Sequence, residues 1–252
     1  MRKVLRPKLE QDTIGLDNFR SPLPHFFRSA SWTHRLSEPV AVQLRQKISL
    51  IVDLREPGET ESDFFIGQRD WDPSTGIERI HLPLYRRTFG DSPVPVLSDI
   101  NSVYFDLLTE SGPAFAQIIS TISQHFQRHS GGVLIHCGAG KDRTGLVTAM
   151  LMQLADRPTG RILADYTRTE TDTSPAWKAQ TLSRLHALGL HNHPRWNEIQ
   201  TLHLEAPAAV LMNALQVLSN LGGTAYYLRE NGCRTRDLVY LNHIWTFQEA
   251  LA

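Results

Sequence analysis

One short segment of the sequence carries the residues best suited to chemistry. It runs from Val133 to Ala155 and holds a glycine-rich loop in which Cys137 is followed, after five residues, by Arg143. The loop does not fit a nucleotide-binding loop of the form GxxxxGK[ST]. Ile135 stands where the first glycine belongs, and Asp142 stands where a hydroxyl residue belongs. The cysteine and the arginine therefore need another explanation.

The loop lies between two segments of regular structure, which makes it a candidate anion site. VLIH predicts a strand and TGLVTAMLMQLA predicts a helix, so backbone N–H groups and the helix dipole point into one concavity. Gly138 and Gly140 let the loop curl, and the small Ala139 keeps its rim open. The planar fork of Arg143 can grip two phosphate oxygens, which a lysine cannot do. Together these residues predict a phosphate cradle.

Cys137 is expected at the centre of this cradle. Helix N-termini and nearby cations lower thiol pKa values from about 8.5 to about 3.5–7.5, so we expect a thiolate at neutral pH. The cradle also stabilises the equatorial oxygens of a loose phosphoryl-transfer transition state, so the chemistry needs no metal or other cofactor. The Thr144 hydroxyl either bonds the sulfur when water attacks the phosphocysteine or serves as a helix cap.

The leaving oxygen of the substrate needs a proton, and a carboxylic acid is the usual donor. Asp142 lies inside the loop and is the first candidate. Its alternative role is that of a structural carboxylate paired with Arg55 or Lys141. Asp91, in the segment RRTFGDSP, is the rival acid on a loop that could swing over the site, or it is a turn residue.

Lys141, Arg55 and Glu59 each have a binding and a structural interpretation, and His136 has a structural one. Lys141 either recognises a second phosphate, as on a phosphoinositide, or balances the charge of Asp142. Arg55 and Glu59 follow the strand IVDL, where a parallel sheet presents its ligand-binding edge. Arg55 is a candidate substrate-binding residue, whereas an ion pair that holds the loop suits Glu59 better. We expect His136 to face away from the nucleophile and to tether the loop by hydrogen bonds.

The rest of the chain predicts one α/β domain, 1–252, in which 1–30 form an irregular lead-in with a short strand near Phe26 and Phe27. Compact runs over 48–54 and 77–84 predict two more strands. Apolar residues at helical spacing predict the helices 37–47, from 113 to the stop at Gly131, 144–155, 162–170, 175–188, 208–223 and 235–251. The expected fold is a short, mostly parallel sheet flanked by helices, with a helical C-terminal portion.

Composition limits the partners. The 26 basic and 26 acidic side chains leave no net field to attract nucleic acid or an anionic membrane. The two cysteines, Cys137 and Cys233, favour a reducing compartment, and Cys233 is expected to be a small hydrophobe or a helix-end residue. The N-terminal residues lack the apolar core of a signal peptide, and no run reaches the length of a membrane helix. We expect a cytoplasmic protein without stable membrane insertion, and the sequence leaves its oligomeric state open.

A cluster of three histidines, His186, His191 and His193, offers a metal interpretation. The segment HALGLHNHP is interrupted by Gly, Asn and Pro and holds no cysteine or carboxylate at ligand spacing. It therefore predicts a solvated turn, and no metal site is expected in the protein.

With these residues in place, the loop HCGAGKDRTG resembles the signature of the cysteine-dependent phosphatases. It is most similar to the bacterial and fungal tyrosine phosphatase branch, whose loop reads HCxAGKDRTG. The resemblance extends over most of the chain through the segments DNFR, FRSASWTHRLSE, IVDLREPGE, HLPL, LADYTRTE and AYYLRENGCRTRDLVYLNHIW. It implies a cysteine-phosphatase-like fold, with Cys137 as nucleophile, Arg143 as phosphate clamp, and Lys141 and Asp142 as the loop residues that set this branch apart.

Two departures from this family pattern carry expectations of their own. The family continues NFRD with a Gly-Gly turn, whereas this chain reads NFRSPLPHFF, which alters the pairing of the N-terminal strand. The stretch between HLPL and Pro113 is also shorter than in the mycobacterial member of the branch. We therefore expect a helical lid to be reduced or absent and the site to be exposed.

The sequence thus predicts a metal-independent phosphatase that hydrolyses phosphate monoesters through a phosphocysteine. Phosphotyrosine in proteins is the first substrate class, with phosphoserine, phosphothreonine and phosphoinositides as further ones. A dedicated phosphoinositide phosphatase is the alternative that Lys141 supports. From a different class comes a non-catalytic phosphate-binding pseudophosphatase, in which Cys137 or Arg143 would be expected to be lost.

Overall fold

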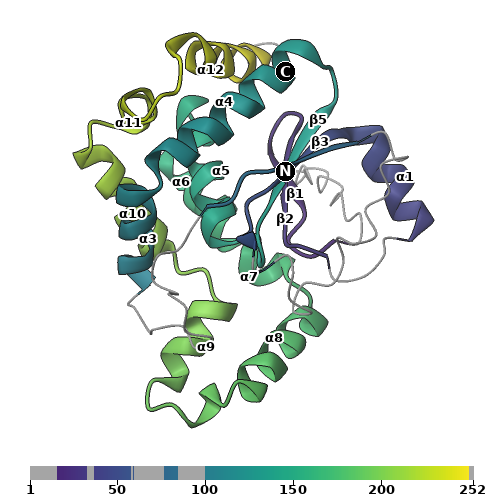
Figure 1. Ribbon diagram of the computed structural model, residues 1–252, viewed down its shortest axis with the longest axis vertical. Coiled ribbons are helices and arrows are strands. Elements are labelled where there is room, and N and C mark those ends of the chain that lie inside the picture. Colours follow the sequence, from purple (N-terminus) through teal and green to yellow (C-terminus); the bar gives the residue numbers. More distant parts are fainter. Residues whose placement is uncertain (1–15, 33–36, 58, 60–76, 85–99, 250–252) are drawn as a thin grey trace, which may run out of the picture.

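A five-stranded sheet lies at the centre of the computed structural model, which describes residues 16–32, 37–57, 59, 77–84 and 100–249 (Figure 1). The strands are β1 (Arg20–Leu23), β2 (Phe26–Ser29), β3 (Ile48–Asp53), β4 (Glu78–His81) and β5 (Gly132–His136), in the order β1-β2-β5-β3-β4. β1 pairs antiparallel with β2, and the other neighbours pair parallel. The mostly parallel sheet predicted from the sequence is confirmed.

Helices cover both faces of this sheet. They are α1 (Glu38–Lys47), α3 (Ile100–Glu110), α4 (Gly112–Arg128), α5 (Asp142–Leu154), α6 (Thr159–Thr167), α7 (Thr169–Asp172), α8 (Pro175–Ala187), α9 (Trp196–Leu204), α10 (Ala208–Asn220), α11 (Thr224–Glu230) and α12 (Thr235–Glu249), with a short 3-10 helix, η4, at Leu190–Asn192. In Figure 1, α1 stands apart on one side, while α4, α5 and α12 lie together on the other.

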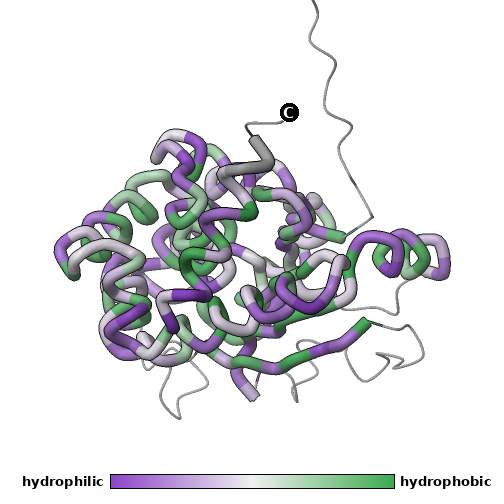
Figure 2. The backbone as a smooth tube through the Cα atoms, turned by 90° about the horizontal axis from the view of Figure 1, so that it is seen from above, coloured by the Kyte–Doolittle hydropathy of each residue, from purple (hydrophilic) through white to green (hydrophobic). Residues whose placement is uncertain are grey.

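The alternation of side chains along the strands explains this arrangement. Val133 and Ile135 of β5 point into the larger core, which includes Ile119 of α4. Leu134 lies between them and points to the opposite face, where it packs in a second core with Leu44 of α1. Every residue of β5 is buried, as expected for a strand covered on both faces. Figure 2 shows hydrophobic stretches alternating with hydrophilic ones along the backbone, helices included.

The N-terminal segment differs from the irregular lead-in that the sequence predicts. The strand expected near Phe26 is present as β2, but β1 precedes it and forms a hairpin with it through Pro24 and His25. His25 has a positive φ of 58°, which supplies the left-handed residue of a tight turn in place of glycine. The altered sequence after NFR therefore still pairs with the sheet. The single-domain assignment stays a prediction.

Among the described residues, three α-helices were not predicted from the sequence: α3, α9 and α11. Before α3 the chain carries many turn-forming residues, which suggested a loop up to Pro113. The helix itself buries Val103, Tyr104, Leu107 and Leu108 along one face. The helix expected over 208–223 is present as α10, which buries Leu211, Leu215 and Leu218.

The C-terminal portion is helical, as predicted. α10 packs against α3 and α6, and α12 packs against α4 and α5. α8, η4 and α9 share a small core of their own, formed by Leu185, Leu190 and Ile199, and they extend away from α12 in Figure 1. Among the described residues, no helix combines the length and the apolar character that a membrane crossing requires.

Candidate active site

The cysteine loop leaves the sheet at the carboxyl ends of its parallel strands. β5 ends at His136, which pairs with Ser29 of β2 on one side and with Asp53 of β3 on the other. Cys137 follows directly, and α5 begins at Asp142. The loop thus runs from a central strand into a helix N-terminus, as the sequence predicts. Such a position gathers backbone N–H groups and the positive end of a helix dipole.

Most of the loop side chains are buried, and Ala139 is half-buried. Cys137 and Lys141 each expose 1% of their surface, and Arg143 exposes 3%. The expectation of an exposed site without a lid stays a prediction, because residues 85–99 lie outside the described residues. Part of the burial of the loop comes from α3, which places Tyr104 against it.

Arg143 is held by a carboxylate from the end of the β3 segment. Its two terminal nitrogens donate to the two oxygens of Glu59 at 2.5 and 2.6 Å, and one of them also donates to the carbonyl of Leu54 at 3.3 Å. Burial disfavours the charge of Arg143, but Glu59, and after it Cys137, raise the pKa of Arg143 above its usual value. Arg143 is therefore a permanent cation beside the cysteine. The sequence favoured an ion pair for Glu59 without identifying Arg143 as its partner.

In the first turn of α5, two buried polar atoms have no hydrogen-bond partner within the described part of the chain. They are the Nε of Arg143 and the hydroxyl oxygen of Thr144. A buried donor without a partner costs free energy, and such groups in native proteins often mark a site for a ligand or for catalysis. Glu59 engages the terminal nitrogens of Arg143, so Nε still has its donor to offer. Thr144 is fully buried and does not use its side chain as a helix cap.

Lys141 and Asp142 point to helices around the loop. The Lys141 ammonium donates to the carbonyl oxygens of Leu202 and Glu205, at 2.5 and 2.8 Å, at the C-terminal end of α9. Asp142 accepts a hydrogen bond from the Tyr104 hydroxyl at 2.9 Å and lies 3.6 Å from the Lys141 ammonium. The pairing with Lys141 that the sequence offered as the structural alternative for Asp142 is thus present.

Tyr104 is a partner of the loop that sequence reasoning missed, because α3 itself was not predicted. Burial, and after it the Asp142 carboxylate, raise the pKa of Tyr104 well above its usual value, so the hydroxyl keeps its proton. Because Tyr104 donates its hydroxyl proton to Asp142, its oxygen can only accept from the Tyr166 hydroxyl, which lies 2.7 Å away. A chain of hydrogen bonds therefore links α6 and α3 to the loop.

The side chain of Arg55 lies against the end of β3. Its guanidinium forms a buried ion pair with Asp53, at 3.0 Å from NH2 to Oδ2, and Arg79 of β4 joins the same carboxylate at 2.6 Å. Burial alone would raise the pKa of Asp53, but His136 in its protonated form, the charge of Arg55 and the hydrogen bond from Arg79 keep this pKa below its usual value. This geometry gives Arg55 a structural contact. Its assignment to substrate binding stays a prediction.

His136 is fully buried beside this cluster. Its Nδ1 lies 3.3 Å from the carbonyl oxygen of Cys137 and 3.7 Å from Asp53, and its ring stacks at a tilt on Trp32. Burial lowers the pKa of His136 from 6.5 to about 4, and the Asp53 carboxylate only partly opposes this effect. A neutral, buried imidazole fits the tethering role that the sequence suggests.

The remaining candidates lie apart from the loop or outside the described residues. Asp91 falls in the range 85–99, which the structure does not describe. His186 and His191 stack ring on ring with centroids 4.6 Å apart, and no group of three potential metal ligands occurs among the described residues. Cys233 is a buried free thiol at the end of α11 that accepts a hydrogen bond from Ser120 at 3.3 Å.

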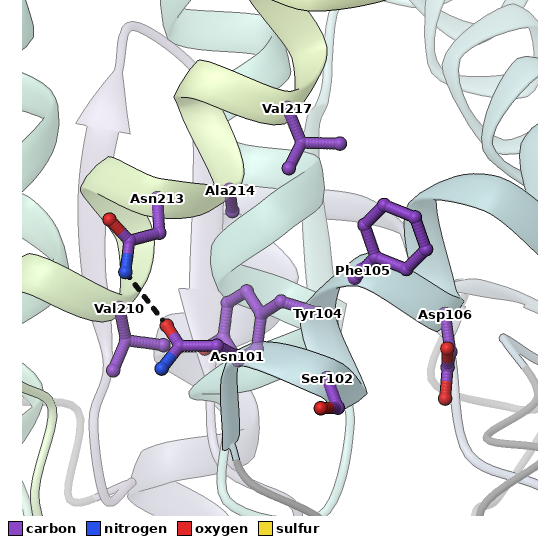
Figure 3. A pocket seen from close by; sticks show the side chains of 9 residues that line it. All are labelled: Asn101, Ser102, Tyr104, Phe105, Asp106, Val210, Asn213, Ala214 and Val217. Atoms are coloured by element: carbon purple, nitrogen blue, oxygen red, sulfur yellow. Dashed lines mark hydrogen bonds between the residues drawn. The ribbon is translucent and has the colours of Figure 1, made fainter.

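A separate cavity of about 340 Å³ lies between α3 and α10 (Figure 3). Asn213 donates to Asn101 across one side of it at 2.9 Å. The residues that line it are Asn101, Ser102, Tyr104, Phe105, Asp106, Val210, Asn213, Ala214 and Val217. Tyr104 thus lies between this cavity and the cysteine loop.

Comparisons with known proteins point to one family. The model of a family described as "Tyrosine phosphatase family" matches residues 24–246. A tyrosine-protein phosphatase of Nostoc commune is 34% identical over 91 residues, which cover 36% of this chain and 28% of that protein. A putative tyrosine-protein phosphatase of Cupriavidus necator is 29% identical over 191 residues, which cover 73% and 65%. The chain spans less than two thirds of the length of either relative.

Solved structures give more distant matches. The Siw14 catalytic core is 16% identical with a TM-score of 0.40, and the match covers 71% of this chain and 92% of that one. A human tyrosine phosphatase-like serine/threonine/tyrosine-interacting protein is 17% identical with a TM-score of 0.39, over 68% and 97%.

Proposed function

Because this chain belongs to the tyrosine phosphatase family, we propose that it hydrolyses phosphate monoesters through a phosphocysteine on Cys137. The observation that carries the proposal is the pair of unpartnered buried atoms, Arg143 Nε and Thr144 Oγ1, beside a cysteine at a helix N-terminus. Phosphotyrosine in proteins is the first substrate class. The narrower placement in the bacterial and fungal branch with the loop HCxAGKDRTG is part of this proposal.

In the first step the Cys137 sulfur attacks the phosphorus, so that an S–P bond forms as the bond to the leaving oxygen breaks. Arg143 binds the equatorial oxygens through its Nε side, and Glu59 keeps the guanidinium plane fixed. The loop N–H groups of Gly138, Ala139 and Gly140 add to this anion site. The leaving oxygen takes a proton from Asp142 or Asp91.

In the second step water attacks the phosphocysteine, inorganic phosphate leaves, and the sulfur departs as a thiolate. The Thr144 hydroxyl donates to the departing sulfur, which uses the hydrogen-bonding capacity that the structure leaves unpaired. No metal enters either step.

A dedicated phosphoinositide phosphatase is the alternative function. The sequence supports this alternative only if Lys141 contacts a second phosphate group of the substrate. The Lys141 ammonium instead donates to two carbonyl oxygens at the end of α9, which favours phosphotyrosine as the first substrate class. A non-catalytic phosphate-binding module is the alternative from a different class.

Phosphate release from a phosphotyrosine peptide and from a short-chain phosphoinositide, measured side by side in excess chelator, tests these functions. We expect release from the peptide to exceed release from the lipid and to disappear in Cys137→Ser. A folded wild-type protein that releases no phosphate from either substrate would contradict the enzyme and support the binding module. Mass spectrometry after acid quenching should detect a phosphate adduct on the peptide that contains Cys137.

The proton donor is identified by the dependence of the rate on the leaving group. We expect one of the variants Asp142→Asn and Asp91→Asn to lose turnover of phosphotyrosine while it retains turnover of an aryl phosphate whose phenol is a good leaving group. The other variant should treat the two substrates as the wild type does. Equal losses on both substrates in both variants would remove both residues from this role.

A further inference from the structure

The carbonyl groups on the outer side of the cysteine loop are held by a set of buried donors. Ser31 donates to the Gly138 carbonyl from its backbone N at 2.8 Å and from its hydroxyl at 3.1 Å. The Asn18 amide donates to the carbonyls of Ala139 and Gly140 at 3.0 and 2.9 Å. Three consecutive peptide groups of the loop are therefore fixed from outside.

Arg28 reinforces the last of these contacts. Its NH2 donates to the Gly140 carbonyl at 2.6 Å, while its NH1 forms an ion pair with Asp165 at 2.5 Å. Arg20 binds the other oxygen of Asp165 at 2.7 Å and also donates to the side-chain oxygen of Asn18. One carboxylate thus fixes both arginines, and Arg20 orients the Asn18 amide so that its NH2 group faces the loop.

The burial, charge and backbone conformation of these residues suit their position behind the loop. Asn18 and Arg28 expose none of their surface, and Arg20 exposes 4%. Burial and then the neighbouring Arg28 lower the pKa of Arg20 to about 10, with Asp165 opposing them, so the cation persists at neutral pH. Asn18 has a positive φ of 58°, a conformation that asparagine tolerates better than most residues. They come from the segments DNFR, FRSAS and LADYTRTE, whose role the reaction itself leaves unexplained.

We propose that Asn18 and Arg28, supported by Arg20, Asp165 and Ser31, are positioning residues that turn the loop N–H groups toward the transferring phosphoryl group. In a trans peptide the C=O and the following N–H point in opposite directions. Donors that hold the carbonyls of Gly138, Ala139 and Gly140 outward therefore direct the next three N–H groups inward. This inference deepens the proposed phosphatase function and rests on it.

The effect should be greatest in the transition state, because the charge on the equatorial oxygens is then matched by fixed donors. Loss of Asn18 would leave the Ala139 carbonyl without this donor, and that peptide group could rotate. We therefore expect kcat to fall more than KM changes, and vanadate, which resembles the transition state, to lose more affinity than inorganic phosphate.

The test compares Asn18→Gly with Asn242→Ala in the full-length protein. Glycine removes the amide and accommodates the positive φ, so Asn18→Gly should fold. Asn242 also donates its amide to a carbonyl, that of Leu154 at 2.8 Å, but at a place remote from the loop. We expect Asn18→Gly to lower kcat by about 10- to 100-fold and to weaken vanadate inhibition by at least about tenfold. Asn242→Ala should lower the melting temperature and leave kcat and vanadate inhibition unchanged.

Two variants and one binding measurement keep the positioning role distinct from the phosphatase function. Ser31→Ala should have a milder effect than Asn18→Gly, because the Ser31 backbone N still holds the Gly138 carbonyl. Arg28→Lys should lose activity, because an ammonium cannot span Asp165 and the Gly140 carbonyl as a fork does.

If the wild type is active and Asn18→Gly matches it in kcat and vanadate inhibition, the positioning role is wrong. If the wild type is inactive, the phosphatase proposal fails. The shift of melting temperature with added vanadate then decides the positioning role, which requires a smaller shift in Asn18→Gly.

Discussion

At the scale of single residues, the site consists of charged groups in partnerships that the sequence cannot specify. The spacing of Cys137 and Arg143 identifies the loop, because few arrangements other than an anion site need a cysteine and an arginine at that distance. The partner of Arg143 is Glu59, which lies in a different segment, and no local pattern indicates that they meet. The side-chain directions of Lys141 and Asp142 depend likewise on α9 and α3, which the sequence did not predict.

Tyr104 gives a test of the hydrogen-bond chain that leads to the loop. Tyr104→Phe removes the donor to Asp142 and the acceptor for Tyr166, both of them in buried surroundings. We expect a loss of about 1–3 kcal/mol in the free energy of unfolding, measured in urea. Tyr240→Phe is the matched control, because its hydroxyl donates to the Phe126 carbonyl away from the loop. Both variants lose a hydroxyl donor, but only Tyr104→Phe should also lose activity; equal activity of the two variants would contradict the assigned role of Tyr104.

His136 predicts how stability depends on pH. Its pKa is about 4 in the folded protein and 6.5 in its ordinary state, so between these values the unfolded chain binds the proton more readily. The contribution of the neutral His136 imidazole to the free energy of unfolding is therefore fully present above pH 6.5. It is lost progressively as the pH falls from 6.5 to about 4. We expect this group to account for a loss of about 3 kcal/mol, and His136→Asn to flatten the acid part of the stability curve by that amount. Unfolding in urea from pH 7 to pH 4 measures it, and identical slopes for both proteins would refute the assignment.

At the scale of elements, the cysteine loop depends on its close approach to the end of β2. Gly140 has a φ of +65°, and a Cβ built on it would lie 2.1 Å from the carbonyl oxygen of Ser29. We expect Gly140→Ala to lower stability by about 1–3 kcal/mol and to abolish catalysis, because the loop must shift. Gly160→Ala is the control, since nothing lies within 4 Å of a Cβ there, and the substitution in α6 should leave stability equal or raise it. Equal thermal stability of both variants would show that the contact at Gly140 can relax.

The contact between Lys141 and the end of α9 can also be tested. Lys141→Met keeps the length of the side chain but removes the ammonium that binds the carbonyls of Leu202 and Glu205. Because α8, η4 and α9 have their own small core, they can open without unfolding the sheet. We expect amide hydrogen exchange to accelerate over 175–206 and to stay unchanged in β5. Uniform acceleration across the chain would instead indicate global destabilisation.

The elements themselves were predicted to different degrees. Strands β3 and β5 and helices α4 and α5 follow from their apolar patterns, because a buried strand and an amphipathic helix need those patterns wherever they pack. The helix α3 was missed because Pro and Ser signals before it masked a short buried stripe. The hairpin of β1 and β2 was missed in part because His25, not glycine, takes the left-handed position of its turn.

At the scale of the whole molecule, the C-terminal helix closes the larger core over the N-terminal hairpin. Trp245 of α12 donates its indole N–H to the Pro24 carbonyl at 3.1 Å and packs edge-on against Phe26 and Phe126. We expect Trp245→Ala to lower the free energy of unfolding by about 3–5 kcal/mol. Val239→Ala, on the same helix with 61% of the valine exposed, should change it by less than about 0.5 kcal/mol. Similar urea midpoints for the two variants would show that α12 does not stabilise the sheet.

The set of contacts around the loop also bears on synthesis of the chain. Donors to the loop come from Asn18 near one end of the sequence, and the acceptors that hold Lys141 are at Leu202 and Glu205. A ribosome adds about 5–20 residues per second. Cys137 therefore leaves the exit tunnel several seconds before α9 has been made and can pack beside the loop. During that interval the thiol is accessible in a way that the finished protein does not permit. The newly made chain therefore passes through a stage in which this cysteine lacks the contacts that bury it in the folded protein.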